Sequence, residues 1–96
     1  MNETKPVPLP PDEVSGRLEQ LPGWTMQENK LVKSFTFDDF VGAVRFVDRL
    51  TEVAEQQGHH PDLFVTWGKV TVELSSHAAG GITEADFRLA AALDNL

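Results

Sequence analysis

The 96-residue sequence predicts one α+β domain, with a four-stranded antiparallel sheet, three helices on one face and the element order α-β-β-α-β-β-α. Three observations lead to this prediction. Segments with helical periodicity flank two pairs of segments in which apolar and polar residues alternate, as they do in hairpins. The length suits one domain, since domains of about 100–150 residues are the commonest. Residues 1–96 show no internal repeat, low-complexity region or domain boundary.

The N-terminal part of the sequence predicts an extended arm and then a short helix. Residues 1–10 are polar and rich in proline, which favours extended backbone. Pro11 suits the first turn of a helix, where its missing N–H leaves no bond unmade. The helix ends at Pro22-Gly23. Three apolar residues of this segment share one helical face: Val14, Leu18 and Leu21.

A first pair of strands is predicted at residues 24–26 and 31–37, with a turn at residues 28–30. The apolar residues of the second strand share one face of the sheet: Leu31, Phe35 and Phe37. Lys33 interrupts this face, so we expect the strand to be half exposed.

A long helix is predicted over residues 38–57, because Asp38 or Asp39 can cap its start and Gly58 marks its end. All but one of its apolar residues fall within roughly 180° of its circumference, and the exception is Val41. A helix that covers one sheet needs an apolar stripe of only about 100°. We therefore expect one flank on the sheet and the other on a second helix, which belongs either to another subunit or to this chain.

The clearest hairpin is predicted over residues 63–75. Apolar and polar residues alternate on either side of Gly68-Lys69, and a two-residue turn there places Trp67 opposite Val70. A glycine-containing loop follows, and Thr83 begins the last helix. Three residues of that helix are predicted on its inner side: Phe87, Ala90 and Ala91.

The composition excludes several classes of protein. Lysine and arginine number 8 against 15 acidic residues, and the net charge of −7 opposes direct binding to nucleic acids and to anionic membrane surfaces. The sequence has no cysteine, which excludes disulfides, thiol nucleophiles and zinc fingers. The N-terminal residues have no apolar or arginine-rich stretch, so we expect no targeting segment. No apolar run approaches the ~18 residues of a membrane span. We therefore expect a cytoplasmic protein that does not enter a membrane.

The stretch from Glu55 to Pro61 is the strongest candidate for chemistry, because it places His59 and His60 side by side at the end of the long helix. Imidazole has a pKa of about 6.5 and exchanges protons near neutral pH. Pro61 restricts the backbone of the residue before it, and Gly58 permits a turn, so the loop is stiff. The two histidines can be catalytic groups, or simply surface residues of a helix-to-strand loop.

Other residues join this stretch through the predicted topology. His77 follows the last strand, and its position lies near the adjacent histidines if that strand runs back beside the preceding one. Asp86 can be catalytic, but Thr83-x-x-Asp86 also resembles a capping box. Glu55 can orient a histidine, or it can be a solvated charge on the helix surface.

Trp24 and Trp67 can line an aromatic pocket or belong to the hydrophobic core. Three histidines and two carboxylates also raise the question of a metal site. The sequence lacks the His-Glu-x-x-His spacing, however, and adjacent histidines rarely bind one ion. Phosphate-binding glycine loops, the dinucleotide-binding fingerprint and the Gly-x-Ser-x-Gly motif are absent as well. We therefore expect neither a metal nor another cofactor.

Together these residues resemble the pterin-4a-carbinolamine dehydratase family. The matching pattern is Glu55, three residues, His59-His60-Pro61, five residues, Trp67, nine residues, His77, eight residues, Asp86. The resemblance covers residues 9–95 and includes segments 77–87 and 35–40, Gly23-Trp24 and Phe46. A dispersed pattern of this length is specific, whereas His-His-Pro alone is not.

The resemblance implies the α+β fold predicted above and catalysis without a metal or cofactor. Its implied substrate is 4a-hydroxytetrahydropterin, and its products are quinonoid dihydropterin and water, a step in the recycling of tetrahydropterin. By resemblance, His59, His60 and His77 surround the C4a–N5 edge of the pterin as acid, base and polarising groups. Glu55 and Asp86 orient them, Asp86 through His77.

The resemblance also implies substrate-binding or orienting roles for Pro61, Trp67 and Trp24. It implies a homodimer or homotetramer built by strand pairing and by packing of the long helix. Some relatives are instead non-enzymatic scaffolds, which act as dimerisation cofactors of transcription factors or as Rubisco assembly factors. The full set of three histidines favours the enzyme, because a scaffold protein has no need of all three.

Overall fold

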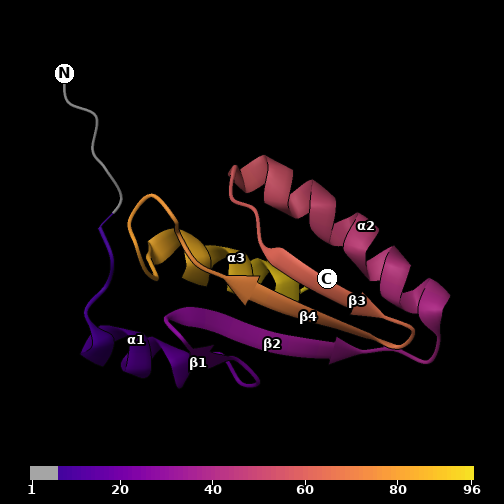
Figure 1. Ribbon diagram of the computed structural model, residues 1–96, viewed down its shortest axis with the longest axis horizontal. Coiled ribbons are helices and arrows are strands. Elements are labelled where there is room, and N and C mark those ends of the chain that lie inside the picture. The colour runs from indigo at the N-terminus through magenta and orange to yellow at the C-terminus, as the bar shows by residue number, and fades with distance from the viewer. Residues whose placement is uncertain (1–6) are drawn as a thin grey trace.

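The computed structural model describes residues 7–96, so residues 1–6 of the predicted N-terminal arm lie outside the described residues. Within this range the helices and strands follow the predicted order, and the α+β prediction is confirmed (Figure 1). The elements are α1 (Pro11–Leu18), β1 (Thr25–Gln27), β2 (Lys30–Thr36), α2 (Phe40–Gln57), β3 (Asp62–Thr66), β4 (Lys69–Leu74) and α3 (Glu84–Asp94). None of the described helices combines the length and the hydropathy needed to cross a membrane.

The strands form one antiparallel sheet in the order β1-β2-β4-β3, which leaves β1 and β3 at its edges. On the core face of the two central strands, Leu31, Val70, Val72 and Leu74 are fully buried. Lys33 and Phe35 of β2 lie on the same face and are half-buried, as expected for a strand that Lys33 interrupts. All three helices contribute to the same hydrophobic core, with Val14 from α1, Ala43, Phe46, Leu50 and Ala54 from α2, and Phe87, Leu89, Ala90 and Leu93 from α3. The other face carries polar pairs such as Ser34 and Thr71, whose hydroxyl oxygens lie 2.8 Å apart. One face is thus packed and the other is solvated, as is common for antiparallel sheets.

Helix α2 has the predicted capping residues. Asp39 accepts a hydrogen bond from the backbone N–H of Gly42 at 2.8 Å, and Gly58 ends the helix in the left-handed conformation, with a φ of 62°. Helix α3 packs beside α2 and covers part of its wide apolar face. Three apolar residues near the start of α2 nevertheless remain exposed: Phe40, Val41 and Val44.

The register of the β3–β4 hairpin differs from the predicted one by two residues. Thr66 pairs with Lys69, so the turn consists of Trp67 and Gly68. A shift of two residues keeps the same side chains on each face of the sheet, so the alternation in the sequence is compatible with both registers. The backbone selects one of them, because the carbonyl oxygen of Gly68 accepts a hydrogen bond from the N–H of Phe37 at 2.8 Å. Trp67 consequently lies in the turn and is 72% exposed.

Two local predictions were wrong. The turn between β1 and β2 has two residues, Glu28 and Asn29, and Lys30 already pairs with Gln27. In α3, Ala91 was predicted on the inner side of the helix but is exposed. The buried residues of the helix recur every three or four positions, and Ala91 lies outside that face. The buried residues of α3 are Asp86, Phe87, Leu89, Ala90 and Leu93.

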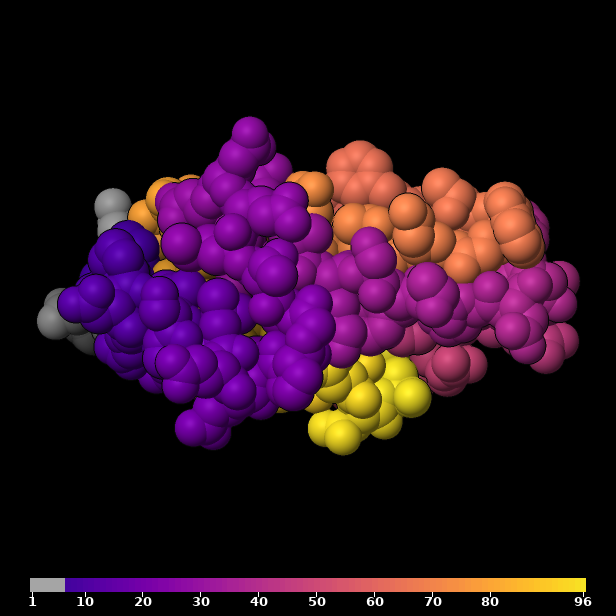
Figure 2. All heavy atoms as spheres, turned by 90° about the horizontal axis from the view of Figure 1, so that it is seen from below, coloured from indigo at the N-terminus to yellow at the C-terminus, as the bar shows by residue number. Residues whose placement is uncertain are grey.

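The molecule is elongated, and its two ends are built from different segments. In Figure 2, α1 and the β1–β2 hairpin lie at one end, and the β3–β4 turn with the start of α2 lies at the other. Figure 1 shows that the end of α2 and the loop after β4 lie away from the β3–β4 turn. The segments that carry the histidines are therefore remote from that turn.

Candidate active site

The end of α2, the loop after β4 and the start of α3 meet at one cleft of about 330 Å³. All three histidines of the chain line it, although they come from two separate segments. The other residues of the cleft are small: Gly58, Ser75, Ser76, Ala78, Thr83 and Ala85. Strand pairing explains the convergence, because Asp62, which follows the first two histidines, pairs with Glu73, which precedes the third.

His59 makes the most enclosed contact of the cleft. Its Nε2 lies 2.5 Å from Oδ1 of Asp86, and the side chains of the two residues are 16% and 0% exposed. Oδ2 of Asp86 accepts hydrogen bonds from the backbone N–H of Thr83 at 2.8 Å and from the hydroxyl of Ser76 at 3.0 Å. Asp86 thus caps α3 and contacts a histidine at the same time. Its partner is His59, and not His77 as the resemblance implied.

The hydrogen bonds around Asp86 determine which nitrogen of His59 carries a proton. A carboxylate only accepts, so Nε2 of His59 and the hydroxyl of Ser76 both donate to it. Ser76 has one hydroxyl proton, and the hydroxyl of Thr83, 2.8 Å away, must therefore donate to Ser76. With Nε2 protonated, Nδ1 of a neutral His59 keeps its lone pair. His59 can thus accept a proton at Nδ1 while Asp86 stabilises the resulting cation.

His60 has a carboxylate partner in a different environment. Its Nε2 lies 2.6 Å from Oε2 of Glu55, and the two side chains are 65% and 68% exposed. Water screens an exposed pair of this kind, which stabilises a fold by about 0–1 kcal/mol. The cleft therefore has one buried and one exposed imidazole–carboxylate pair.

His77 differs from the other two histidines. It is exposed, and within residues 7–96 its imidazole makes no hydrogen bond or ion pair. It also lines a second, smaller cleft of about 200 Å³. His77 is therefore the histidine whose two ring nitrogens are both available to a ligand.

The structure does not bring the two tryptophans to the histidine cleft. Trp24 is buried in the core, where its Nε1 donates to the carboxylate of Asp94 at 3.1 Å. Trp67 is separated from His60 by the five-residue strand β3, which spans roughly 16 Å. Pro61 joins His60 to that strand and is half-buried.

Two hydroxyl residues of the site were not expected from the sequence. Ser76 links the loop of His77 to Asp86, and Thr83 continues the same hydrogen-bond chain. The sequence predicts Thr83 as the start of a helix and as part of a capping box with Asp86, but not as a residue of the site. A serine that follows a strand carries no signal of this kind. Within residues 7–96, no group of three or more histidine, aspartate and glutamate side chains is arranged to hold a metal ion.

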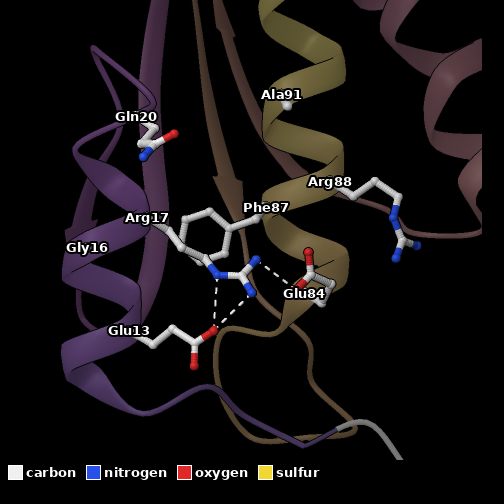
Figure 3. A pocket seen from close by; sticks show the side chains of 8 residues that line it. All are labelled: Glu13, Gly16, Arg17, Gln20, Glu84, Phe87, Arg88 and Ala91. Carbon is white, nitrogen blue, oxygen red and sulfur yellow. Dashed lines mark hydrogen bonds and ion pairs between the residues drawn. The ribbon is translucent and has the colours of Figure 1, made fainter.

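A larger hollow of about 610 Å³ lies between α1 and α3 (Figure 3). Arg17 reaches across it from α1, and its guanidinium nitrogens lie 2.9 Å from Glu13 and 2.7 Å from Glu84. Hydrogen bonds to Glu84 and Glu13 raise the pKa of Arg17, and the bond to Arg17 lowers the pKa of Glu84. The guanidinium also lies 5.5 Å from the ring centre of Phe87. These charges satisfy one another, so we assign the hollow a structural role in holding α1 to α3.

Comparison with known proteins gives a consistent result. The family model described as pterin 4 alpha carbinolamine dehydratase matches residues 7–96. A relative from Thermosynechococcus vestitus is 48% identical over 88 residues, which cover 92% of this chain and 93% of the relative. A relative from Sulfolobus acidocaldarius is 41% identical over 88 residues, with 92% and 97% covered. Both are provisionally named pterin-4-alpha-carbinolamine dehydratases.

Two solved structures share the fold. The crystal structure of a transcriptional coactivator/pterin dehydratase from Brucella melitensis superimposes with a TM-score of 0.88 at 31% identity, over 92% of this chain and 96% of that one. A pterin dehydratase-like protein, identified as a RuBisCO assembly factor in the alpha-carboxysome, superimposes with a TM-score of 0.61 at 26% identity. That match covers 75% of this chain and 83% of the assembly factor.

Proposed function

Because the chain belongs to the pterin-4-alpha-carbinolamine dehydratase family, we propose that it converts 4a-hydroxytetrahydropterin to quinonoid dihydropterin and water. The observation that carries this proposal is the cleft at which all three histidines meet, two of them bonded to carboxylates. The reaction needs only proton transfers, and imidazoles are the side chains best suited to them near neutral pH.

The reaction can be written with protons and electrons balanced. A base removes the proton from N5, and the electron pair left on N5 forms the C4a=N5 double bond. The C4a–O bond breaks, and the departing oxygen takes a proton from an acid and leaves as water. Each positioned acid or base contributes about 10²–10⁴-fold to such a rate.

The three histidines are suited to different parts of this reaction. We propose His59 as the base, since its Nε2 is occupied by Asp86 and its Nδ1 carries the lone pair. His60 and His77 then protonate the departing hydroxyl and polarise the C4a–N5 edge. Glu55 orients His60 by their hydrogen bond of 2.6 Å.

The test is the dehydration of 4a-hydroxytetrahydropterin generated in a coupled phenylalanine hydroxylase reaction. We expect the wild-type protein to accelerate dehydration over buffer, and we expect His60→Ala to lower kcat/KM by about 10²–10⁴-fold. Gln56→Ala is a matched control, because Gln56 is an exposed residue of the same helix end and we expect it to keep full activity. A wild-type rate equal to that of buffer would disprove the proposal.

A second candidate function is that of a non-enzymatic assembly protein, which the similarity to the RuBisCO assembly factor favours. A scaffold uses its surface and does not need imidazole chemistry. If the chain were a scaffold, the wild-type protein would not accelerate dehydration, and the His60→Ala variant would still bind its partner. We favour the enzyme because the cleft keeps all three histidines and both carboxylate partners.

We further propose that the chain forms a homodimer or homotetramer and acts in the cytoplasm. Exposed apolar residues on α2 and on the edge strand β3 support the assembly: Phe40, Val44, Phe64 and Val65. The net charge of −7 and the lack of cysteine suit the cytoplasm. Cell fractionation tests the location, and light scattering of the wild type and of α2 variants tests the assembly.

A further inference from the structure

The loop that carries His77 is closed on itself. Ser76 and Gly81 form an isolated β-bridge, with the N–H of Ser76 donating to Gly81 at 2.9 Å. Inside the loop, the N–H of Gly80 donates to the carbonyl oxygens of Ser76 and His77 at 2.9 and 3.1 Å. His77 is thus part of a compact unit, and its place in the cleft depends on how that unit is held.

From one side, the loop is held by the Asp86 network. The hydroxyl of Ser76 donates to Asp86, whose other oxygen accepts from His59. This side therefore connects the base of the loop to the buried imidazole pair. Within residues 7–96, α3 makes no hydrogen bond to Gly80, which adjoins the closing residue Gly81.

The loop is also held at Gly80 by the turn between β1 and β2. Nδ2 of Asn29 donates to the carbonyl oxygen of Gly80 at 3.1 Å, across 51 positions of sequence. The contact is tight, since a Cβ at Gly81 would lie 3.1 Å from the same Nδ2 atom. Glu28 and Asn29 both have positive φ, of 50° and 64°, which asparagine tolerates better than most residues. The backbone of this turn therefore aims the amide of Asn29 at the loop.

The turn and the loop enclose the second cleft of about 200 Å³, and this cleft shares three residues with the first: Ser75, Ser76 and His77. His77 consequently separates the two clefts. Asn29 and Gly80 line the second cleft, whereas His59 lines the first. A shift of the loop toward the second cleft would withdraw His77 from the other two histidines.

We propose that Asn29 is a positioning residue. Through its bond to Gly80, it keeps the loop of His77 in place, so that His77 stays at the same cleft as His59 and His60. This role rests on the proposed function, because it matters only if the three imidazoles act on one substrate. Asn29 itself does not touch the substrate. The loop is thus held at Gly80 by Asn29 and at its base by Ser76, while the N–H of Leu9 holds the adjoining Ile82 at 2.8 Å. We therefore expect the loss of Asn29 to loosen the loop at Gly80.

The experiment uses Asn29→Asp and Asn29→Gly in the full chain. Aspartate keeps the shape and tolerates the left-handed backbone, but its oxygens cannot donate to the Gly80 carbonyl. Glycine adopts the same backbone freely and has no side chain and no charge. Glu28→Gly is the matched control, because Glu28 has the same left-handed backbone in the same turn and, within the described residues, no side-chain bond to the loop.

Two readouts separate positioning from a general loss of structure. Amide exchange by NMR should accelerate at Gly80 and Gly81 by about 5- to 10-fold in both Asn29 variants, as the loss of one hydrogen bond implies. The imidazole resonances of His77 should shift while those of His60 stay in place. We expect kcat/KM to fall by about 10- to 100-fold in both, since a displacement near 1 Å can cost that much, and Glu28→Gly should keep the wild-type value.

The outcomes distinguish this inference from the function on which it rests. A wild-type protein without dehydratase activity would overturn the proposed function. An active wild type whose Asn29 variants match it in kcat/KM would overturn only the positioning role. Unchanged exchange at Gly80 and Gly81 would show that Asn29 does not hold the loop, and it would overturn the inference as well.

Discussion

At the scale of single residues, Asp86 combines two roles that the sequence presents as alternatives. One oxygen accepts from the N–H of Thr83 and completes the capping box, and the other accepts from His59. The cap depends on a spacing of three residues, so it was predictable from the sequence. The pairing with His59 was not, because it depends on the path of residues 58–61 after α2. The same path brings His60 to Glu55. From the sequence, Glu55 could equally have been a solvated charge on the helix surface.

The double role of Asp86 gives a prediction for Asp86→Asn. The amide can no longer accept hydrogen bonds from His59, Ser76 and Thr83 at once, and a buried donor is left without its partner. We expect the free energy of unfolding to fall by about 1–3 kcal/mol, and kcat to fall by about 10²-fold or more. Urea unfolding and the dehydration assay measure the two effects.

Asp86→Glu is the control that separates these effects. Glutamate is the usual residue at this position of a capping box, so it can keep the cap while its longer side chain displaces the carboxylate from His59. We expect it to retain more stability than Asp86→Asn and still to lose activity. Full activity in Asp86→Asn, even with lower stability, would contradict an orienting role for Asp86.

At the scale of elements, Arg17 joins α1 to α3 through its ion pair with Glu84, and this pair gives a prediction for pH. Arg17 lowers the pKa of Glu84 in the folded chain below its ordinary value. Stability from this pair is therefore present above the unfolded pKa of glutamate, about 4.3, and is lost as the pH falls through the folded pKa. The pair is exposed, so we expect Glu84→Gln to lower Tm at pH 7 by a few degrees at most.

The difference in Tm between wild type and Glu84→Gln should disappear in acid, below the folded pKa of Glu84. Thermal scans between pH 7 and pH 2 measure it. Glu19→Gln is a suitable control, because Glu19 is an exposed glutamate at the end of α1 without an ion pair in the described residues. An equal difference for both variants across the whole range would show that the Arg17 pair does not hold α1.

The elements also show where local sequence signals are sufficient. Both caps of α2 follow from residue types that satisfy helix ends, and both were predicted. The register of the β3–β4 hairpin was not, because alternation with a period of two is unchanged by a shift of two residues. The deciding contact, between Gly68 and Phe37, joins residues 31 positions apart (68 minus 37) and leaves no pattern in the sequence.

At the scale of the whole molecule, the convergence of His77 with His59 and His60 was predictable from topology. Strands β3 and β4 are antiparallel neighbours, so the start of β3 and the end of β4 lie beside the same cleft. The position of Trp67 was not predictable in the same way. It belongs to the family pattern, but in this chain it lies at the far end of β3 from the histidines. Its exposure places it among the apolar groups that a second copy of the chain could cover.

The exposed apolar groups of α2 are suited to a contact with a second copy of the chain. Phe40, Val44 and Val47 lie at i, i+4 and i+7 and form one flank of α2, and the first two are 55% and 38% exposed. Val41 is 54% exposed but lies outside the apolar half of the helix. If the flank packs on a helix of another subunit, Val44→Asp buries a charge at that contact, whereas Val41→Asp makes the same chemical change in solvent.

We expect light scattering at micromolar concentration to give a dimer or tetramer for the wild type, and half of that mass for Val44→Asp. Val41→Asp should keep the wild-type mass, which makes it a control for the added charge and for the lower helix propensity of aspartate. A monomeric wild type would exclude the assembly altogether. Equal masses for all three proteins above the monomer would exclude α2 as the contact. The two edges of the sheet, β1 and β3, would remain, because their unpaired backbone groups can extend the sheet into a second subunit.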